Sequence, residues 1–229
     1  MTQPPTENPE VEALRAKVAR IRREPVARLA QLDPDGLHDA ERIAVAARLQ
    51  AKKQTAAALR FLEAAASSPE PSPYVNYRDV YTRLIDHWRG AGQRQRALEC
   101  LEQLCAHDRQ RAPAMLRGDR RLMAEILADD GQGERAMAIW RSLVAEQPGD
   151  GTALYELGSF LRRLGQFPQA IQCLERATEA WRRQGYTRLV EVGEQQLASV
   201  RQEAGLPETA EARVYPTEGG VPILEAKTP

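Results

Sequence analysis

The sequence predicts an all-α protein made of stacked helix pairs, and three observations carry this prediction. From about residue 37 to 205, apolar residues recur at spacings of three and four, the period of an amphipathic helix. Only one short stretch, residues 74–81, is rich in strand-forming side chains, and helical periodicity flanks it on both sides. A short motif of glycine, alanine and a large apolar residue recurs every 34 to 39 residues. One helix pair cannot bury its apolar face alone, so successive pairs must stack.

The composition fits a folded protein and excludes several functional classes. The 32 Lys+Arg and 32 Asp+Glu cancel to a formal net charge of zero. Nucleic acid and anionic lipid both require a positive excess, so we expect neither as the main partner. Three cysteines are too few for a disulfide framework, and an odd number cannot pair completely. The N-terminus lacks the pattern of a signal peptide, and no apolar run reaches about 18 residues, so we expect a cytoplasmic protein.

The N-terminal region is expected to form a helical cap over residues 11–36. Residues 1–10 are polar and hold three prolines, which predicts disorder. Beyond them, Leu14, Val18 and Ile21 form a helical stripe that Pro25 interrupts, because proline lacks the N–H that a helix interior needs. The Asp-Pro-Asp-Gly sequence at 33–36 then predicts a turn before the first repeat.

The repeated motif occurs four times. Gly131-Gln-Gly-Glu-Arg-Ala136 aligns with Gly165-Gln-Phe-Pro-Gln-Ala170 at an offset of 34 residues, and a large apolar residue follows each alanine four positions later. The copies that begin at Gly92 and Lys53 precede these at steps of 39 residues, and the one at Lys53 lacks the glycine. A glycine here suits the left-handed residue that ends a helix, and the alanine suits the point where two helices approach most closely.

This pattern resembles the tetratricopeptide repeat family, whose helix–turn–helix unit is about 34 residues long. Four copies cover about 39–72, 78–111, 117–150 and 151–184, and the last fits best through Leu157-Gly158, Ala170 and Leu174. The resemblance implies a right-handed α-solenoid of stacked repeats over 37–184. A C-terminal capping helix would follow at 185–205, and the polar, proline- and glycine-containing residues 206–229 are expected to form a flexible tail.

The resemblance also implies a function: family members bind a partner peptide or helix in a concave groove lined by the first helix of each repeat. We therefore expect a non-catalytic scaffold or adaptor for protein–protein interaction. The lysine and asparagine set with which some members hold a terminal carboxylate does not appear. The family's groove positions fall on Arg83, Asp86, Arg89, Arg121, Glu125, Tyr155, Glu156, Ser159, Arg162 and Arg163.

No motif in the chain indicates an enzyme, a cofactor or a metal. The fingerprint Gly131-x-Gly-x-x-Ala136 would bind a dinucleotide only after a buried strand, and helical periodicity precedes it here. Cys100 and Cys105 lie about 140° apart around a helix, so together with His107 they do not converge as zinc ligands. The cysteines are expected to be small packing residues.

Two other interaction modes remain open. Six basic residues between Arg15 and Arg28, against Glu12 and Glu24, make a basic helix that could attach to RNA or to a membrane surface. Its aliphatic stripe is also what a cap packed on the first repeat would show. The second mode is self-association, through an open edge of the solenoid or through the N-terminal stripe, which would make the protein a homo-oligomer.

Overall fold

A computed structural model describes residues 8–69 and 72–206, and all regular structure in these ranges is helical. The predicted all-α fold class is confirmed. The N-terminal residues 1–7 and, of the expected flexible tail at 206–229, all but Leu206 lie outside the described residues. The α-helices are α1 (Pro9–Ile21), α2 (Val26–Leu29), α3 (Asp39–Ala51), α4 (Thr55–Ala66), α5 (Tyr77–Gly90), α6 (Arg94–Arg111), α7 (Leu116–Asp129), α8 (Gly133–Glu146), α9 (Gly151–Arg163), α10 (Phe167–Arg183) and α11 (Thr187–Glu203).

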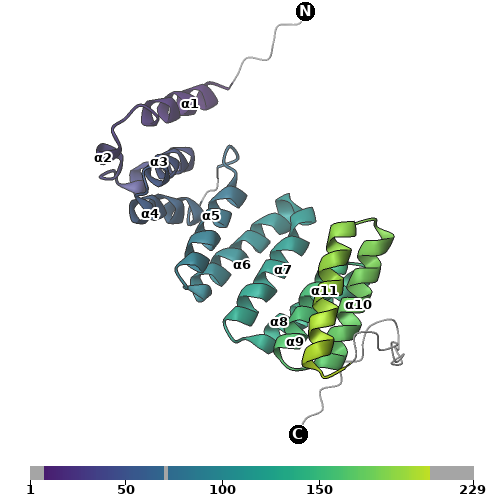
Figure 1. Ribbon diagram of the computed structural model, residues 1–229. Coiled ribbons are helices and arrows are strands. Elements are labelled where there is room, and N and C mark those ends of the chain that lie inside the picture. Colours follow the sequence, from purple (N-terminus) through teal and green to yellow (C-terminus); the bar gives the residue numbers. More distant parts are fainter. Residues whose placement is uncertain (1–7, 70–71, 207–229) are drawn as a thin grey trace, which may run out of the picture. The chain divides into compact units, whose positions relative to one another are not determined.

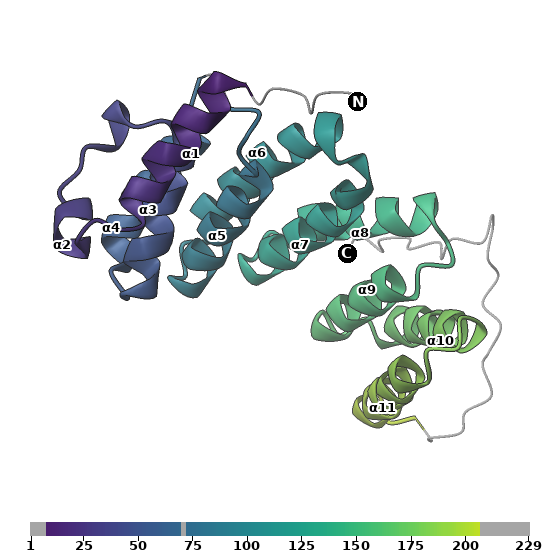
Figure 2. The ribbon, with the colours of Figure 1, turned by 90° about the horizontal axis from the view of Figure 1, so that it is seen from above.

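The helices fall into two compact units that divide between Pro113 and Ala114. In unit 1, α3 pairs with α4 and α5 with α6, while α1 packs on α3. In unit 2, α7 pairs with α8 and α9 with α10, and α11 packs on α10 (Figures 1 and 2). Within each unit, neighbouring pairs also contact one another through α4 and α5, or through α8 and α9. Stacked helix–turn–helix pairs are thus the building principle of both units.

The same turn joins the two helices of each pair. In three of the pairs, a glycine in the left-handed region follows the first helix. The N–H of the next residue donates to a carbonyl five residues earlier, which closes the helix end. The predicted role of the three glycines is therefore confirmed. Their φ angles are 71° at Gly92, 78° at Gly131 and 70° at Gly165. The closing bonds run from Gln93 to Trp88, from Gln132 to Leu127 and from Gln166 to Leu161.

The first pair makes this turn without a glycine. Lys53 has φ 59°, and Gln54 N–H donates to the Leu49 carbonyl over 3.0 Å. A side chain in the left-handed region costs about 1 kcal/mol, because its Cβ crowds the following carbonyl oxygen.

We expect Lys53→Gly to raise the free energy of unfolding by about 1 kcal/mol, measured by urea unfolding. The neighbouring Lys52 has φ −103°, so Lys52→Gly should give no gain. An equal gain in both variants would contradict this explanation.

The α9–α10 pair is held at short range by small residues. A Cβ added to Gly158 would lie 2.9 Å from Leu174 Cγ and 3.1 Å from the backbone oxygen of Ala170. Ala170 itself is completely buried. The expected close approach at this alanine is therefore present. Across the contact between pairs, Trp140 of α8 lies against Phe160 of α9, with ring centroids 4.9 Å apart.

The N-terminal helix begins at Pro9, two residues before the predicted start. The Asn8 side chain accepts the Glu10 N–H over 3.0 Å, and the proline stands in the first turn, where a missing N–H costs nothing. From the sequence, the prolines of residues 1–10 predicted disorder, and the role of Asn8 as a helix N-cap was missed. At its other end, Arg48 of α3 donates to the Ile21 carbonyl over 3.2 Å and to the Glu24 carbonyl over 3.0 Å. These bonds attach the end of α1 to α3.

The start of α5 is set by a buried polar cluster. The Tyr77 hydroxyl donates to Asp39 and accepts the Ser72 N–H over 2.8 Å, while Arg42 contacts the same carboxylate at 2.7 Å. Burial and the hydrogen bond to Asp39 raise the pKa of Tyr77 well above its usual range. The strand-forming stretch at 74–81 is therefore a connection followed by helix, because Tyr77 is anchored to α3 at the first position of α5.

Candidate functional site

The structure places every predicted groove residue on the first helix of a pair. Arg83, Asp86 and Arg89 lie on α5 in unit 1. The other seven lie on α7 and α9 in unit 2, and we call them the first-helix face. The members of the first-helix face are Arg121, Glu125, Tyr155, Glu156, Ser159, Arg162 and Arg163.

An ion pair between α7 and α9 forms one end of the first-helix face. Arg121 Nε lies 3.2 Å from both carboxylate oxygens of Glu156, and Trp140 Nε1 donates to the same carboxylate over 3.4 Å. Both charged side chains are about one-third exposed, at 34% for Arg121 and 28% for Glu156. Burial raises the pKa of Glu156, and the opposing effect of Arg121 does not cancel it.

The raised pKa of Glu156 sets the sign of a pH effect. A carboxyl group with a higher pKa in the folded protein favours folding in its protonated form, so its contribution is present at low pH and is lost as pH rises through the folded value. Glu156→Gln should therefore reduce the fall in stability between pH 4 and pH 7, measured as urea midpoints. Glu146, whose pKa is lowered mainly by a hydrogen bond from Arg120, provides the opposite control. If both glutamines shift the pH profile in the same direction, the assignment to burial is wrong.

Arg162 is held by α11. Its guanidinium donates to Glu203 over 2.9 Å, to the Ser199 hydroxyl over 2.8 Å and to the Gln196 side chain. Side-chain hydrogen bonding to Glu203 raises the pKa of Arg162 further above its usual range. A partner that binds through this arginine must therefore displace α11 contacts, which makes Arg162 foremost a tether between α9 and α11.

The remaining residues of the first-helix face are more accessible. Arg163 contacts Asp129 of α7 at 3.2 Å and keeps 55% of its side chain exposed. Its guanidinium also lies 5.4 Å from the centre of the Phe160 ring. The half-buried Tyr155 lies with its ring centroid 5.4 Å from that of Trp181. The face thus combines an aromatic ring held against Trp181 with charged side chains of the same helix.

The three residues on α5 repeat part of this arrangement. Arg83 pairs with Asp79 at 2.9 Å and also donates to Gln50 of α3 over 3.2 Å. Asp86 is exposed and Arg89 is half-buried. Unit 1 thus has its own polar surface on successive first helices.

Polar bridges between successive first helices are a feature that the sequence reading missed. They join residues about one repeat apart, with separations of 33 residues for Arg83–Gln50, 35 for Arg121–Glu156 and 34 for Arg163–Asp129. The repeat period could have predicted these bridges, since an arginine and an acceptor one repeat apart lie on neighbouring first helices. Three of the predicted groove arginines, Arg83, Arg121 and Arg163, accordingly bridge neighbouring first helices.

Of the three cysteines, Cys173 occupies a packing position, whereas Cys100 and Cys105 are half-buried. Cys173 is fully buried, and burial raises its pKa to about 11. Gly131 follows helix α7, so the fingerprint that begins there has no strand before it. In residues 8–69 and 72–206, no group of three or more His, Cys, Asp or Glu side chains could hold a metal ion. Over the same residues, no helix is both long and apolar enough to cross a bilayer.

Comparison with known proteins identifies the repeats. Residues 127–183, from the end of α7 through α10, match the tetratricopeptide repeat family model. The crystal structure of BtubC (BKLC) from P. vanneervenii is similar in fold, with a TM-score of 0.53 over 84% of this chain and 85% of that chain, at 19% identity. No curated protein matches the chain. Residues 127–183 therefore match tetratricopeptide repeats, and the similarity to the solved structure concerns the fold alone.

Proposed function

We propose that this protein is a non-catalytic scaffold that binds a segment of a partner protein on the first-helix face of unit 2. Tetratricopeptide repeats generally mediate protein–protein interaction. The observation that carries the proposal is that Tyr155 of α9 lies half-buried against Trp181, on the same helix that supplies Glu156 to the ion pair with Arg121 and carries the exposed Arg163. A flat amphipathic ring with charged groups beside it is the kind of surface that contributes most to peptide binding.

The ordered network around Tyr155 supports the same proposal. Arg121 and Arg163 are each held by a carboxylate of a neighbouring first helix, and Arg162 by Glu203 of α11, so these side chains are already restricted. Binding then requires little further ordering on the scaffold's side. The face carries both signs of charge, so we expect a partner segment with mixed polar groups and an apolar residue to cover Tyr155.

A photo-crosslinking experiment tests this proposal. A photoreactive amino acid at Ser159, half-buried on α9, should capture the partner, whereas the same amino acid at the exposed Ala138 of α8 should not. The captured protein is then purified, and its dissociation constant is measured with wild type and with Tyr155→Ala. Loss of a central aromatic contact should weaken binding about tenfold or more. Equal capture from both positions, or equal affinity for both proteins, would overturn the assignment.

Self-association is a second candidate, and α11 supplies the observation that favours it. Leu189 and Val192 on this helix are 39% and 37% exposed. They stand before Gly193 at the spacings that Leu154 and Leu157 have before Gly158, and in α9 those two leucines are only 1% exposed. α11 thus leaves partly exposed two apolar positions whose counterparts on α9 are buried.

The oligomeric state tests this candidate. A second copy of the chain that covers this face would give a dimer by light scattering, and Leu189→Glu with Val192→Glu should return it to a monomer. Ala198→Glu, also exposed on α11, is the matched control and should remain dimeric. A wild-type protein that is monomeric at high micromolar concentration removes the candidate.

A further inference from the structure

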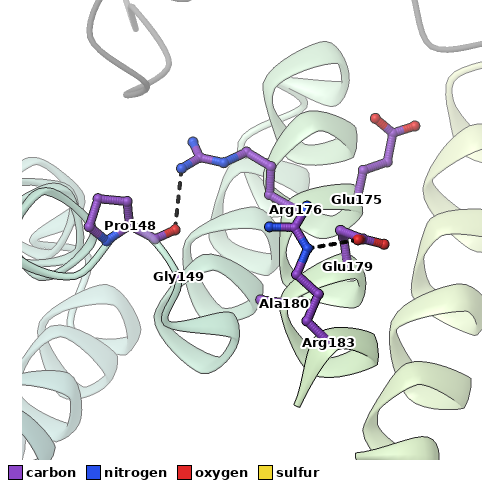
Figure 3. Close-up of a pocket in the computed structure, with 7 residues that line it drawn as sticks. All are labelled: Pro148, Gly149, Glu175, Arg176, Glu179, Ala180 and Arg183. Atoms are coloured by element: carbon purple, nitrogen blue, oxygen red, sulfur yellow. Dashed lines mark hydrogen bonds and ion pairs between the residues drawn. The ribbon is translucent and has the colours of Figure 1, made fainter. Parts of the chain in front are cut away.

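A pocket of about 450 Å³ lies in unit 2, between α10 and the connection from α8 to α9. It is lined by α10, the second helix of its pair, and by this connection, whereas the first-helix face is made by α7 and α9. Figure 3 shows the Arg176 side chain reaching from α10 towards Pro148, and the Arg183 guanidinium turned back along α10 towards Glu179. The lining residues are Pro148, Gly149, Glu175, Arg176, Glu179, Ala180 and Arg183.

Both carboxylates of the pocket are already neutralised. Glu179 accepts from Arg182 and from Arg183, each over 2.9 Å. Glu175 accepts from Arg201 over 2.7 Å. Side-chain hydrogen bonds from Arg182 and Arg183 lower the pKa of Glu179, so this group stays ionised and paired at neutral pH.

Arg176 is the pocket group that keeps an unmatched donor. Its Nη2 makes one long hydrogen bond of 3.4 Å to the Pro148 carbonyl. Its Nη1 is buried and meets no acceptor among the described residues. A buried donor without an acceptor is unfavourable, and the long bond to Pro148 restrains the guanidinium only weakly. The side chain can therefore gain a partner by turning into the pocket.

The charge balance indicates a singly charged anion. Among the charged lining residues, Arg183 pairs with Glu179 and Glu175 pairs with Arg201, whereas Arg176 bonds, within the described part of the chain, only to the Pro148 carbonyl and is the guanidinium left for an anion. A guanidinium matches a carboxylate geometrically, because two parallel N–H groups meet its two oxygens. The Pro148 ring and the Ala180 methyl group provide an apolar wall for the carbon atoms beside such a carboxylate.

We propose that this pocket binds a carboxylate of an extended peptide, with Arg176 as its main ligand and Arg183 in support. The carboxylate would come either from an acidic side chain or from a peptide C-terminus. The site is independent of the first-helix face, so a partner could be bound at two places on unit 2. A phosphate dianion fits less well, since the second arginine of the lining, Arg183, is already paired with Glu179.

An NMR titration tests the proposal on the full chain. The probes are the capped peptides Ac-Ala-Ala-Glu-Ala-Ala-NH2 and Ac-Ala-Ala-Gln-Ala-Ala-NH2, together with Ac-Ala-Ala-Ala-Ala-Ala with a free C-terminus. The Arg176 Nε–Hε resonance should shift saturably with a carboxylate peptide and at least tenfold more weakly with the glutamine peptide. The tighter of the two carboxylate probes identifies the source. Tighter binding of a phosphoserine analogue, or no saturable shift with either carboxylate, would overturn the proposal.

Variants show whether the pocket itself is responsible. Arg176→Gln should weaken the carboxylate peptide tenfold or more, and Arg176→Lys, which keeps the charge but loses the planar fork, should weaken it less. Ala180→Glu leaves both arginines in place and should weaken binding to a similar extent by repulsion. Arg135→Gln, an exposed arginine of α8, is the control and should bind as wild type does. Unchanged affinity in Arg176→Gln and Ala180→Glu, both with wild-type circular dichroism, would place the carboxylate elsewhere.

Discussion

Trp140→Ala is expected to lower the free energy of unfolding of unit 2 by about 3–5 kcal/mol. Trp140 is 2% exposed and fills the contact between two consecutive helix pairs, against Phe160. Removing the indole leaves a cavity that these helices can close only in part, and it deprives Glu156 of the Nε1 donor. Stacking between pairs, and not pairing alone, should therefore fail in this variant.

Urea unfolding followed by far-UV circular dichroism measures the loss, and hydrogen exchange locates it. Amides of α9 should exchange faster, since α9 meets Trp140 directly through Phe160. Trp140→Phe keeps an aromatic ring and gives up only the N–H and part of the volume, so its loss should be clearly smaller. A loss in the phenylalanine variant as large as in the alanine variant would mean that the hydrogen bond to Glu156, and not the packing, holds this contact.

Ala170→Leu should lower the free energy of unfolding by about 1–3 kcal/mol, because it forces a larger side chain into a packed contact. Ala170 is 0% exposed, and its carbonyl oxygen lies 3.1 Å from where a Gly158 Cβ would be. A leucine can be accommodated only if α9 and α10 move apart or if other side chains leave their preferred rotamers. Either response weakens the packing of the best-matched repeat.

A matched substitution separates crowding from a general effect of leucine. Ala138 lies on α8 and is exposed, so Ala138→Leu adds the same atoms where there is space and should change stability by less than about 0.5 kcal/mol. Thermal unfolding of both variants gives the comparison. A melting temperature that Ala170→Leu leaves unmoved would contradict the short helix–helix distance.

The sequence predicted the helix pairs well because the repeat signal is local. A glycine followed five residues later by an alanine marks a turn and a close helix contact, and both are properties of the residue itself. Lys53 shows that the backbone pattern persists even where the marker is absent: its φ of 59° follows from the position and not from the residue type. The early start of α1 was missed because the capping role of Asn8 was not weighed against Pro9.

The candidate site was less predictable, because its contacts depend on neighbouring helices. Family position placed Arg162 on the first-helix face, but its partner Glu203 is 41 residues away on a helix whose placement depends on further packing. At Gly193 a Cβ would lie 2.3 Å from Thr178 Oγ1, so a residue without a side chain allows α11 to approach α10. The hydrogen bonding of Arg176 likewise depends on a distant residue, because its Nη2 donates to the carbonyl of Pro148, 28 residues earlier, and its Nη1 meets no acceptor among the described residues. Sequence spacing alone does not show which partner a side chain will lack.

The left-handed glycine returns outside the paired helices, after α10 at Gly185 with φ 76° and after α11 at Gly205 with φ 67°. Each again precedes an N–H that closes the helix end, at Tyr186 and at Leu206. The turns that end α9, α10 and α11 thus share one design, a left-handed glycine followed by the N–H that closes the helix. In-frame duplication or loss of a whole hairpin in this part of the gene would leave each junction intact, so evolution, or an engineer, could alter the reach of the protein in fixed steps without inventing a new connector.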